Sequence, residues 1–257
     1  MKHRLIILFT ILIAAVTSQA SGIDYIAQGN TAFEQKQFKK ATQMYERALR
    51  DGESSLLHYN LGNAYYRLGD RAHAVLNYER ALKLDPGNDD ARFNLKFVNE
   101  KSKINETSGT NYFTTLISGW VGHLSSNTWA MISLAMFVLM LAAIACYRIA
   151  TGVALQKTGF FGAIALGIIA LLAMACAIYM YRHTTKAHYA IVMTDKAPAN
   201  KSPREGEKEE FKLPSGSKVE IIDSISNDKS ANAAMWYMIE TTSNKTGWMK
   251  KADLEKI

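Results

Sequence analysis

Two uninterrupted apolar stretches divide the hydrophobic and polar pattern of this 257-residue chain into three parts. They cover residues 129–147 and 160–181, and neither contains a charged residue. Helices of 19 and 22 residues reach roughly 28 to 33 Å, which matches the hydrocarbon thickness of a bilayer. A buried hairpin in a soluble core is the alternative, but its helices would normally carry a polar stripe. The pattern predicts two transmembrane helices joined by a loop at 148–159.

The N-terminal segment sets the orientation of this hairpin. Residues 1–20 begin with basic side chains, continue with an apolar run and end in the small residues Ser18 and Ala20. This order is typical of a signal peptide cleaved after Ala20, and an uncleaved anchor helix is the alternative. Under both interpretations the following segment is exported. We therefore expect a multi-pass protein of the cytoplasmic (inner) membrane, with the 148–159 loop cytoplasmic and the N-terminal and C-terminal domains periplasmic.

An internal repeat with an offset of 33 residues occupies the region before the membrane. Residues 29–33 (GNTAF) align with 62–66 (GNAYY), and 41–49 align with 74–82. The offset is close to the 34-residue helix–turn–helix period of tetratricopeptide repeats, and the glycines and alanines allow close helix packing. The region resembles the tetratricopeptide family. A third helix is predicted at Asp89–Lys101, where the repeat pattern ends. The sequence therefore predicts an all-α solenoid over 21–107 that consists of two repeats and a capping helix.

Residues 108–128 connect this solenoid to the first apolar stretch. Apolar side chains recur there at helical spacing, with polar residues on the other side. Such a stripe suits a helix lying in the outer membrane interface. Packing of the same stripe against the solenoid is the alternative, and the pattern does not decide between them.

The region after the second apolar stretch has the period of β-strands. Short strands are predicted at 188–194, 217–225, 234–242 and 246–250, with polar or Gly/Pro breaks between them. Several strands in so short a region indicate a small all-β barrel over 182–257. The order of Pro198, the charged loop 202–210, Leu213-Pro214-Ser215-Gly216, Trp236 and Gly247-Trp248 resembles bacterial SH3-like domains.

The complete order of segments describes a multidomain membrane protein: signal peptide, tetratricopeptide repeats, membrane hairpin and SH3-like domain. It resembles the BatE type of protein from the Bacteroides aerotolerance operon family. That resemblance implies a scaffolding role in the bacterial cell envelope, a link to aerotolerance, and membrane partners that carry von Willebrand A domains.

Candidate ligand-binding positions lie on one face of the first helix of each repeat. The peptide-binding groove is predicted from Asn30, Phe33, Tyr59, Asn60, Asn63, Tyr66 and Arg67. A carboxamide offers a donor and an acceptor to a peptide backbone. Asn30 and Asn60 also match the carboxylate-clamp type of groove, but Ile26, Asp90 and Asn94 stand where that type has cations, so a free carboxylate is not expected. In the alternative interpretation, the asparagine side chains form hydrogen bonds within the solenoid.

Other candidate chemistry is sparse. Trp236 and Trp248 could form an aromatic platform; packing is favoured for Trp236, and Trp248 stays open. Catalytic motifs, metal-ligand spacing and cofactor motifs are absent, and Cys146 and Cys176 lie inside the apolar stretches. The net charge of +7 is spread among acids, which gives no reason to expect nucleic acid. The leading hypothesis is a non-enzymatic adaptor; the alternative is a cell-wall protein whose SH3-like domain binds peptidoglycan, with a hydrolase or redox enzyme ranking last.

Overall fold

The computed structural model describes residues 24–101, 121–185, 188–226 and 235–257. The described parts form two compact units. One unit joins the N-terminal helices to the C-terminal strands, and the other is the apolar hairpin. The signal peptide predicted at 1–20 and most of the segment predicted at 108–128 lie outside the described residues.

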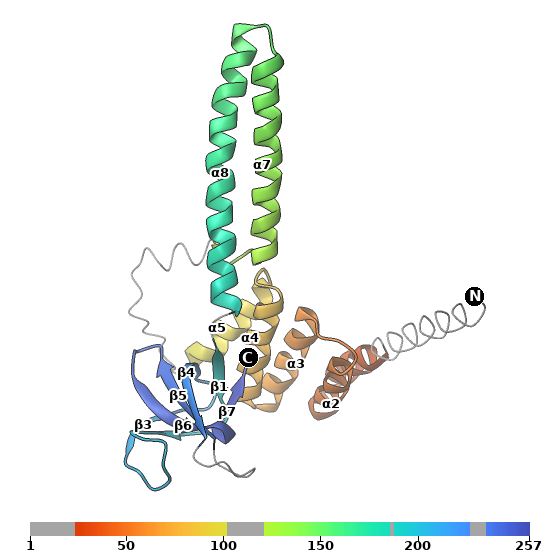
Figure 1. The fold of residues 1–257 in the computed structure, drawn as a ribbon. Helices are drawn as coiled ribbons and strands as arrows, with labels where there is room; N and C mark the ends of the chain where they lie inside the picture. Colours follow the sequence, from red (N-terminus) through yellow and green to blue (C-terminus); the bar gives the residue numbers. More distant parts are fainter. Residues whose placement is uncertain (1–23, 102–120, 186–187, 227–234) are drawn as a thin grey trace, which may run out of the picture. The chain divides into compact units, whose positions relative to one another are not determined.

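Helices build the first part of the larger unit (Figure 1). A helix over residues 24–34 is followed by α2 (Phe38–Leu49), α3 (Ser55–Leu68), α4 (Arg71–Leu84) and α5 (Asp89–Lys101). In the turn between α3 and α4, Gly69 adopts a left-handed φ of 80°, and the Asp70 carboxylate accepts a hydrogen bond from the His73 N–H at 3.2 Å. The Asn88 side chain caps α5 by accepting from the Ala91 N–H at 2.9 Å. The helical repeat region predicted from the sequence is therefore present.

The second unit consists of two long helices that lie side by side (Figure 1). They are α7 (Ser126–Ile149) and α8 (Val153–Thr185), and both are long and apolar enough to cross a membrane. The Ser133 hydroxyl donates to the Ala170 carbonyl at 2.9 Å, which satisfies a buried polar group between the helices. A Cβ added to Gly159 would lie 2.8 Å from the Ala143 carbonyl oxygen, so glycine permits the close approach.

Both helices are longer than their apolar stretches. The sequence predicts a loop over 148–159, whereas the structure leaves only residues 150–152 between the helices. Polar residues of the predicted loop instead form the first turns of α8, where the Gln156 side chain donates to the Ala150 carbonyl at 2.8 Å. The apolar pattern marks the part of a helix that suits a lipid environment, and helical backbone bonding continues beyond it.

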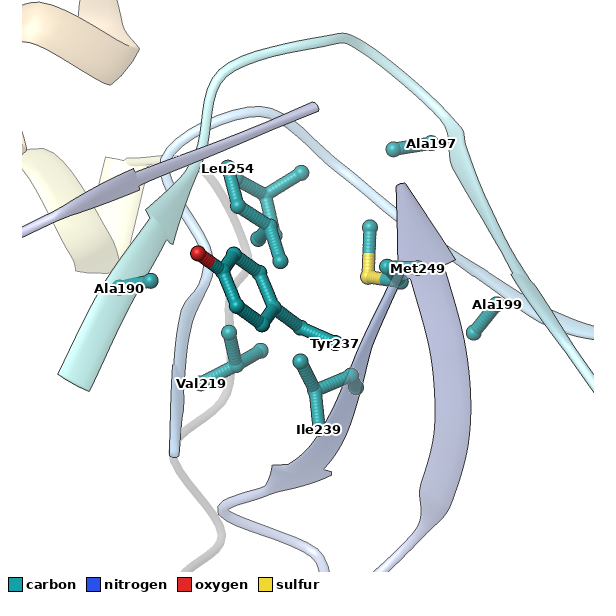
Figure 2. Packing of buried hydrophobic residues seen from close by; sticks show 9 residues of the cluster. Ala190, Ala197, Ala199, Val219, Tyr237, Ile239, Met249 and Leu254 are labelled. Carbon is teal, nitrogen blue, oxygen red and sulfur yellow. The ribbon is translucent and has the colours of Figure 1, made fainter. Parts of the chain in front are cut away.

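Strands of the C-terminal region pair into one antiparallel sheet. They are β1 (Tyr189–Val192), β2 (Ala197–Asn200), β3 (Glu209–Leu213), β4 (Lys218–Ser226), β5 (Met235–Thr241), β6 (Thr246–Lys250) and β7 (Leu254–Lys256). Their order in the sheet is β3-β2-β6-β5-β4-β1-β7. The core of this sheet is compact (Figure 2): the Tyr237 ring lies between Leu254 and Val219, with Ile239 and Met249 beside it.

The closed barrel predicted from the sequence is not found. The edge strands β3 and β7 do not pair with each other in the part of the chain that the structure describes, so the sheet is not closed. Strand pairing is also short between β2 and β6, which are joined by the single residue pair Asn200 and Trp248. The strands β2, β3 and β7 were not predicted, because each is only three to five residues long and shows little alternation.

Candidate functional site

The two helix pairs of the solenoid repeat the same close contact. A Cβ added to Gly29 would lie 2.5 Å from Cε1 of Tyr45, and one added to Gly62 would lie 2.7 Å from Cε1 of Tyr78. Both tyrosines are fully buried. The Ala74 carbonyl oxygen would also lie 3.3 Å from the added atom at Gly62. The glycines thus let a tyrosine ring pack directly on the backbone of the first helix in each pair.

The same tyrosines orient the two asparagines of the predicted groove. The Tyr45 hydroxyl donates to Asn30 Oδ1 at 2.8 Å, and the Tyr78 hydroxyl donates to Asn63 Oδ1 at 2.7 Å. Asn94 of α5 donates a further hydrogen bond to Asn63 Oδ1 at 2.8 Å. The acceptor halves of both carboxamides are therefore used inside the solenoid, as the alternative interpretation of the sequence allowed.

The donor halves of these carboxamides remain available. Among the described residues, neither Nδ2 of Asn30 nor Nδ2 of Asn63 has a hydrogen-bond partner. Burial, followed by the charge of Glu34, raises the pKa of Tyr45 to about 12, and burial also raises the pKa of Tyr78. Both phenols therefore keep their protons at neutral pH and hold the amide groups in one orientation. Each helix pair therefore holds one carboxamide whose N–H donors are oriented and available to an acceptor group.

Aromatic and cationic side chains of the predicted groove make contacts along the same helices. The Phe33 and Phe38 rings meet edge to face at 5.3 Å, and the Arg67 guanidinium lies over Phe38 at 5.4 Å. Tyr59 lies against Tyr78 at a centroid distance of 6.3 Å. Asn60 is half-buried. These contacts preorganise the groove side chains and leave Arg67 largely exposed.

The helix α5 adds aromatic residues that sequence reasoning did not include. The Phe97 ring meets Tyr66 edge to face at 6.0 Å. Phe93 and Phe97 are 70% and 45% exposed, which is unusual for two aromatic residues on one helical face. Their spacing of four residues was the available signal. This signal was missed because the repeat pattern ends at Lys96, so the helix was interpreted as a capping helix without a binding face.

A buried polar pair lies behind this surface, between α3 and α4. The Asn77 carboxamide donates to the His73 carbonyl at 2.8 Å, which leaves its Oδ1 to accept from Nδ1 of His58 at 3.0 Å. The buried Nε2 of His58 has no hydrogen-bond partner among the residues that the structure describes. Burial, the largest influence, lowers the pKa of His58. The imidazole is thus held neutral, in the tautomer with its proton on Nδ1.

The aromatic residues proposed for the sheet differ in exposure. Trp236 is 1% exposed, whereas Trp248 is half-buried. Only Trp248 therefore presents part of its ring to solvent. Within the described ranges, no group of three or more His, Cys, Asp or Glu residues could hold a metal ion.

Comparison with known proteins agrees with the helical geometry. The family model of the tetratricopeptide repeat matches residues 55–88, which cover α3, the Gly69 turn and α4. A search of curated proteins finds no match. The chain contains a tetratricopeptide repeat at 55–88, and such repeats are modules of protein–protein interaction.

Proposed function

We propose that the chain is a non-enzymatic membrane adaptor that binds a partner protein through the groove of its tetratricopeptide repeats. The repeat at 55–88 supports this proposal most strongly, since that module binds other proteins. The carboxamides of Asn30 and Asn63, with oriented N–H donors, supply a physical means of holding acceptor groups of an extended segment. On α5, which contacts Asn63 through Asn94, the exposed rings of Phe93 and Phe97 supply apolar area.

The membrane part of the proposal rests on α7 and α8. Their length and composition suit two passes through a bilayer. A hairpin brings the chain back to the side it left, so residues 24–101 and 188–257 share one compartment, which we propose to be the periplasm. The grouping of these two regions in one compact unit supports the proposal that they share a compartment.

The identity of the partner follows only from the resemblance to the BatE type of protein. We propose membrane proteins with von Willebrand A domains, in an envelope complex linked to aerotolerance.

The groove is tested by removing its donors while keeping its acceptors. In Asn30→Asp with Asn63→Asp, the retained Oδ1 atoms still accept from Tyr45 and Tyr78, whereas the N–H donors are replaced by a negative charge. The full chain is purified in detergent from cells, and co-purifying membrane proteins are quantified by mass spectrometry. Gln43→Glu, the same chemical change on the exposed side of α2, is the matched control.

We expect the double variant to lose most of the partner recovered with the control, at unchanged helical circular dichroism. Each lost hydrogen bond costs about 0.5 to 1.5 kcal/mol, and repulsion of acceptor groups adds to this. Equal recovery with both variants would contradict binding through the groove. Topology is tested separately by reporter fusions after Lys101 and after Ile257, which should both report the periplasm; a cytoplasmic signal from one of them would contradict the shared compartment.

A further inference from the structure

The face of α4 that points away from the groove is covered by the C-terminal sheet. Ile191 of β1 is fully buried in one hydrophobic cluster with Ala74, Val75, Leu76 and Tyr78 of α4. Met193 and Ile257 pack against the same cluster. In a solenoid, the outer face of the second helix of a repeat is normally exposed to solvent, so this apolar cover is a specific feature of the chain.

Polar contacts surround the apolar centre of this interface. The Arg71 guanidinium donates through Nε to the Ser215 carbonyl at 2.9 Å, and Lys83 Nζ donates to the Ile257 carbonyl at 2.7 Å. Lys218 Nζ lies 2.8 Å from Glu79 Oε2. Arg80 Nη2 donates to Glu255 Oε1 and to the Lys256 carbonyl, both at 2.9 Å. An apolar centre with a charged rim has the anatomy of a specific protein interface.

The loop between β3 and β4 is shaped for this contact. Gly216 has a φ of +84°, which favours glycine. A Cβ added there would lie 3.2 Å from Nε of Arg71 and 3.6 Å from Cγ2 of Val75. The turn thus brings its backbone close to α4, where the Ser215 carbonyl accepts from Arg71.

The opposite side of α4 packs on α3, the helix that carries the predicted groove residues. Tyr78 belongs to the same hydrophobic cluster as Ile191 of the sheet, and its hydroxyl donates to Asn63. Tyr59 and Tyr66 of the groove also pack on this cluster. One continuous core therefore runs from the sheet, through α4, to the groove side chains.

From this geometry we propose that the C-terminal sheet is a binding partner of the tetratricopeptide repeat in the same chain, and that its docking on α4 holds the groove in its binding conformation. The sheet occupies the outer face of the repeat and leaves the groove face to an external partner. This inference extends the proposed adaptor function. The test measures hydrogen exchange in α3 and α4, so its result does not depend on whether a groove ligand exists.

The test is a charge exchange across the interface in the detergent-solubilised full chain. Lys218→Glu and Glu79→Lys each place like charges opposite one another, and the double exchange restores an opposite pair. Lys250→Glu is the matched control. Lys250 Nζ pairs with Glu205 Oε1 at a distance of 2.8 Å, and this ion pair does not involve α4. Hydrogen exchange by mass spectrometry reports on α3 and α4, with β5 and β6 as reporters of the sheet itself.

Each single reversal should speed exchange in α4 and α3 about tenfold, and the double exchange should restore most of the protection. The control should leave α3 and α4 unchanged. Unchanged exchange in the Glu79→Lys and Lys218→Glu variants would overturn the proposal, as would a double exchange that fails to restore protection. Protection of α4 that falls on dilution of the wild-type chain would also overturn it, since the sheet would then come from a second copy.

Discussion

The helix pair over residues 24–49 and the pair over 55–84 share their internal geometry but differ in their surroundings. Each has a glycine under a buried tyrosine and a carboxamide that accepts from its hydroxyl. Only the second pair has α5 on one side and the sheet on another. Only the second is matched by the tetratricopeptide model.

The turn within the second helix pair also has the more favourable sequence of the two. Gly69 and Asp70 of the second pair correspond to Lys36 and Gln37 of the first, at the repeat offset. The backbone bonds are equivalent: Lys36 N–H donates to the Phe33 carbonyl at 2.9 Å, and Gly69 N–H donates to the Tyr66 carbonyl at 3.0 Å. Yet Lys36 must adopt a φ of 61°, and Gln37 makes no side-chain cap. A repeat can keep its fold while its turn sequence departs from the one that favours it.

The largest difference is expected from overpacking the glycines. Gly62→Leu should destabilise its helix pair by about 1 to 3 kcal/mol, because the new side chain meets both the Tyr78 ring and the Ala74 backbone. Gly29→Leu should cost less, since Tyr45 atoms are its close contacts and a ring can move more easily than backbone. Hydrogen exchange of α3 and α4 against that of residues 24–49 measures both in one molecule. Equal effects of the two substitutions would show that the backbone contact does not matter.

A smaller difference is expected from exchanging the turn residues. Lys36→Gly should stabilise the first pair by up to about 1 kcal/mol, because it removes the left-handed strain of a residue with a Cβ. Gly69→Lys should destabilise the second pair by a similar amount. Thermal unfolding of the full chain, followed by helical circular dichroism, gives the sign of each change. A lower midpoint for Lys36→Gly would contradict the strain.

The smallest difference between the two helix pairs is expected in their response to pH. It depends on one buried titratable group, His58, which lies in the second pair. His58 has a lowered pKa in the folded chain, so its stabilising contribution is present above the unfolded value of about 6.5 and is lost as pH falls below it. The first pair has Tyr25 at the equivalent position. Lowering the pH should therefore speed exchange in α3 and α4 more than in 24–49, after correction for the intrinsic rate.

A matched variant isolates this histidine. His58→Gln keeps a donor towards Asn77 and removes the titration. It should make the two helix pairs respond equally to acid. An unchanged difference between the pairs would assign the acid sensitivity to another group.

The sequence predicted those features that depend on local pattern. The repeat offset predicted close helix packing at its glycines and alanines, which Gly62 shows against Ala74. The apolar stretches predicted the long helices α7 and α8. Contacts between distant segments were not predictable in this way. Nothing in the pattern of α4 showed that Glu79 pairs with Lys218, which lies 139 residues away. Equally, the sequence around Asn63 does not reveal that its Oδ1 accepts from Tyr78 while its Nδ2 has no partner among the described residues.

Photocross-linking in cells can detect directly whether the groove of the second helix pair binds a protein. A photoreactive benzoylphenylalanine replaces Arg67 in the groove or Gln43 on the exposed side of α2, in cells that produce the full chain. We predict a discrete adduct with a membrane protein from position 67, none from position 43, and loss of the adduct when Asn63→Asp is added. Equal adducts from both positions, or an adduct at position 67 that persists with Asn63→Asp, would contradict protein binding through the groove.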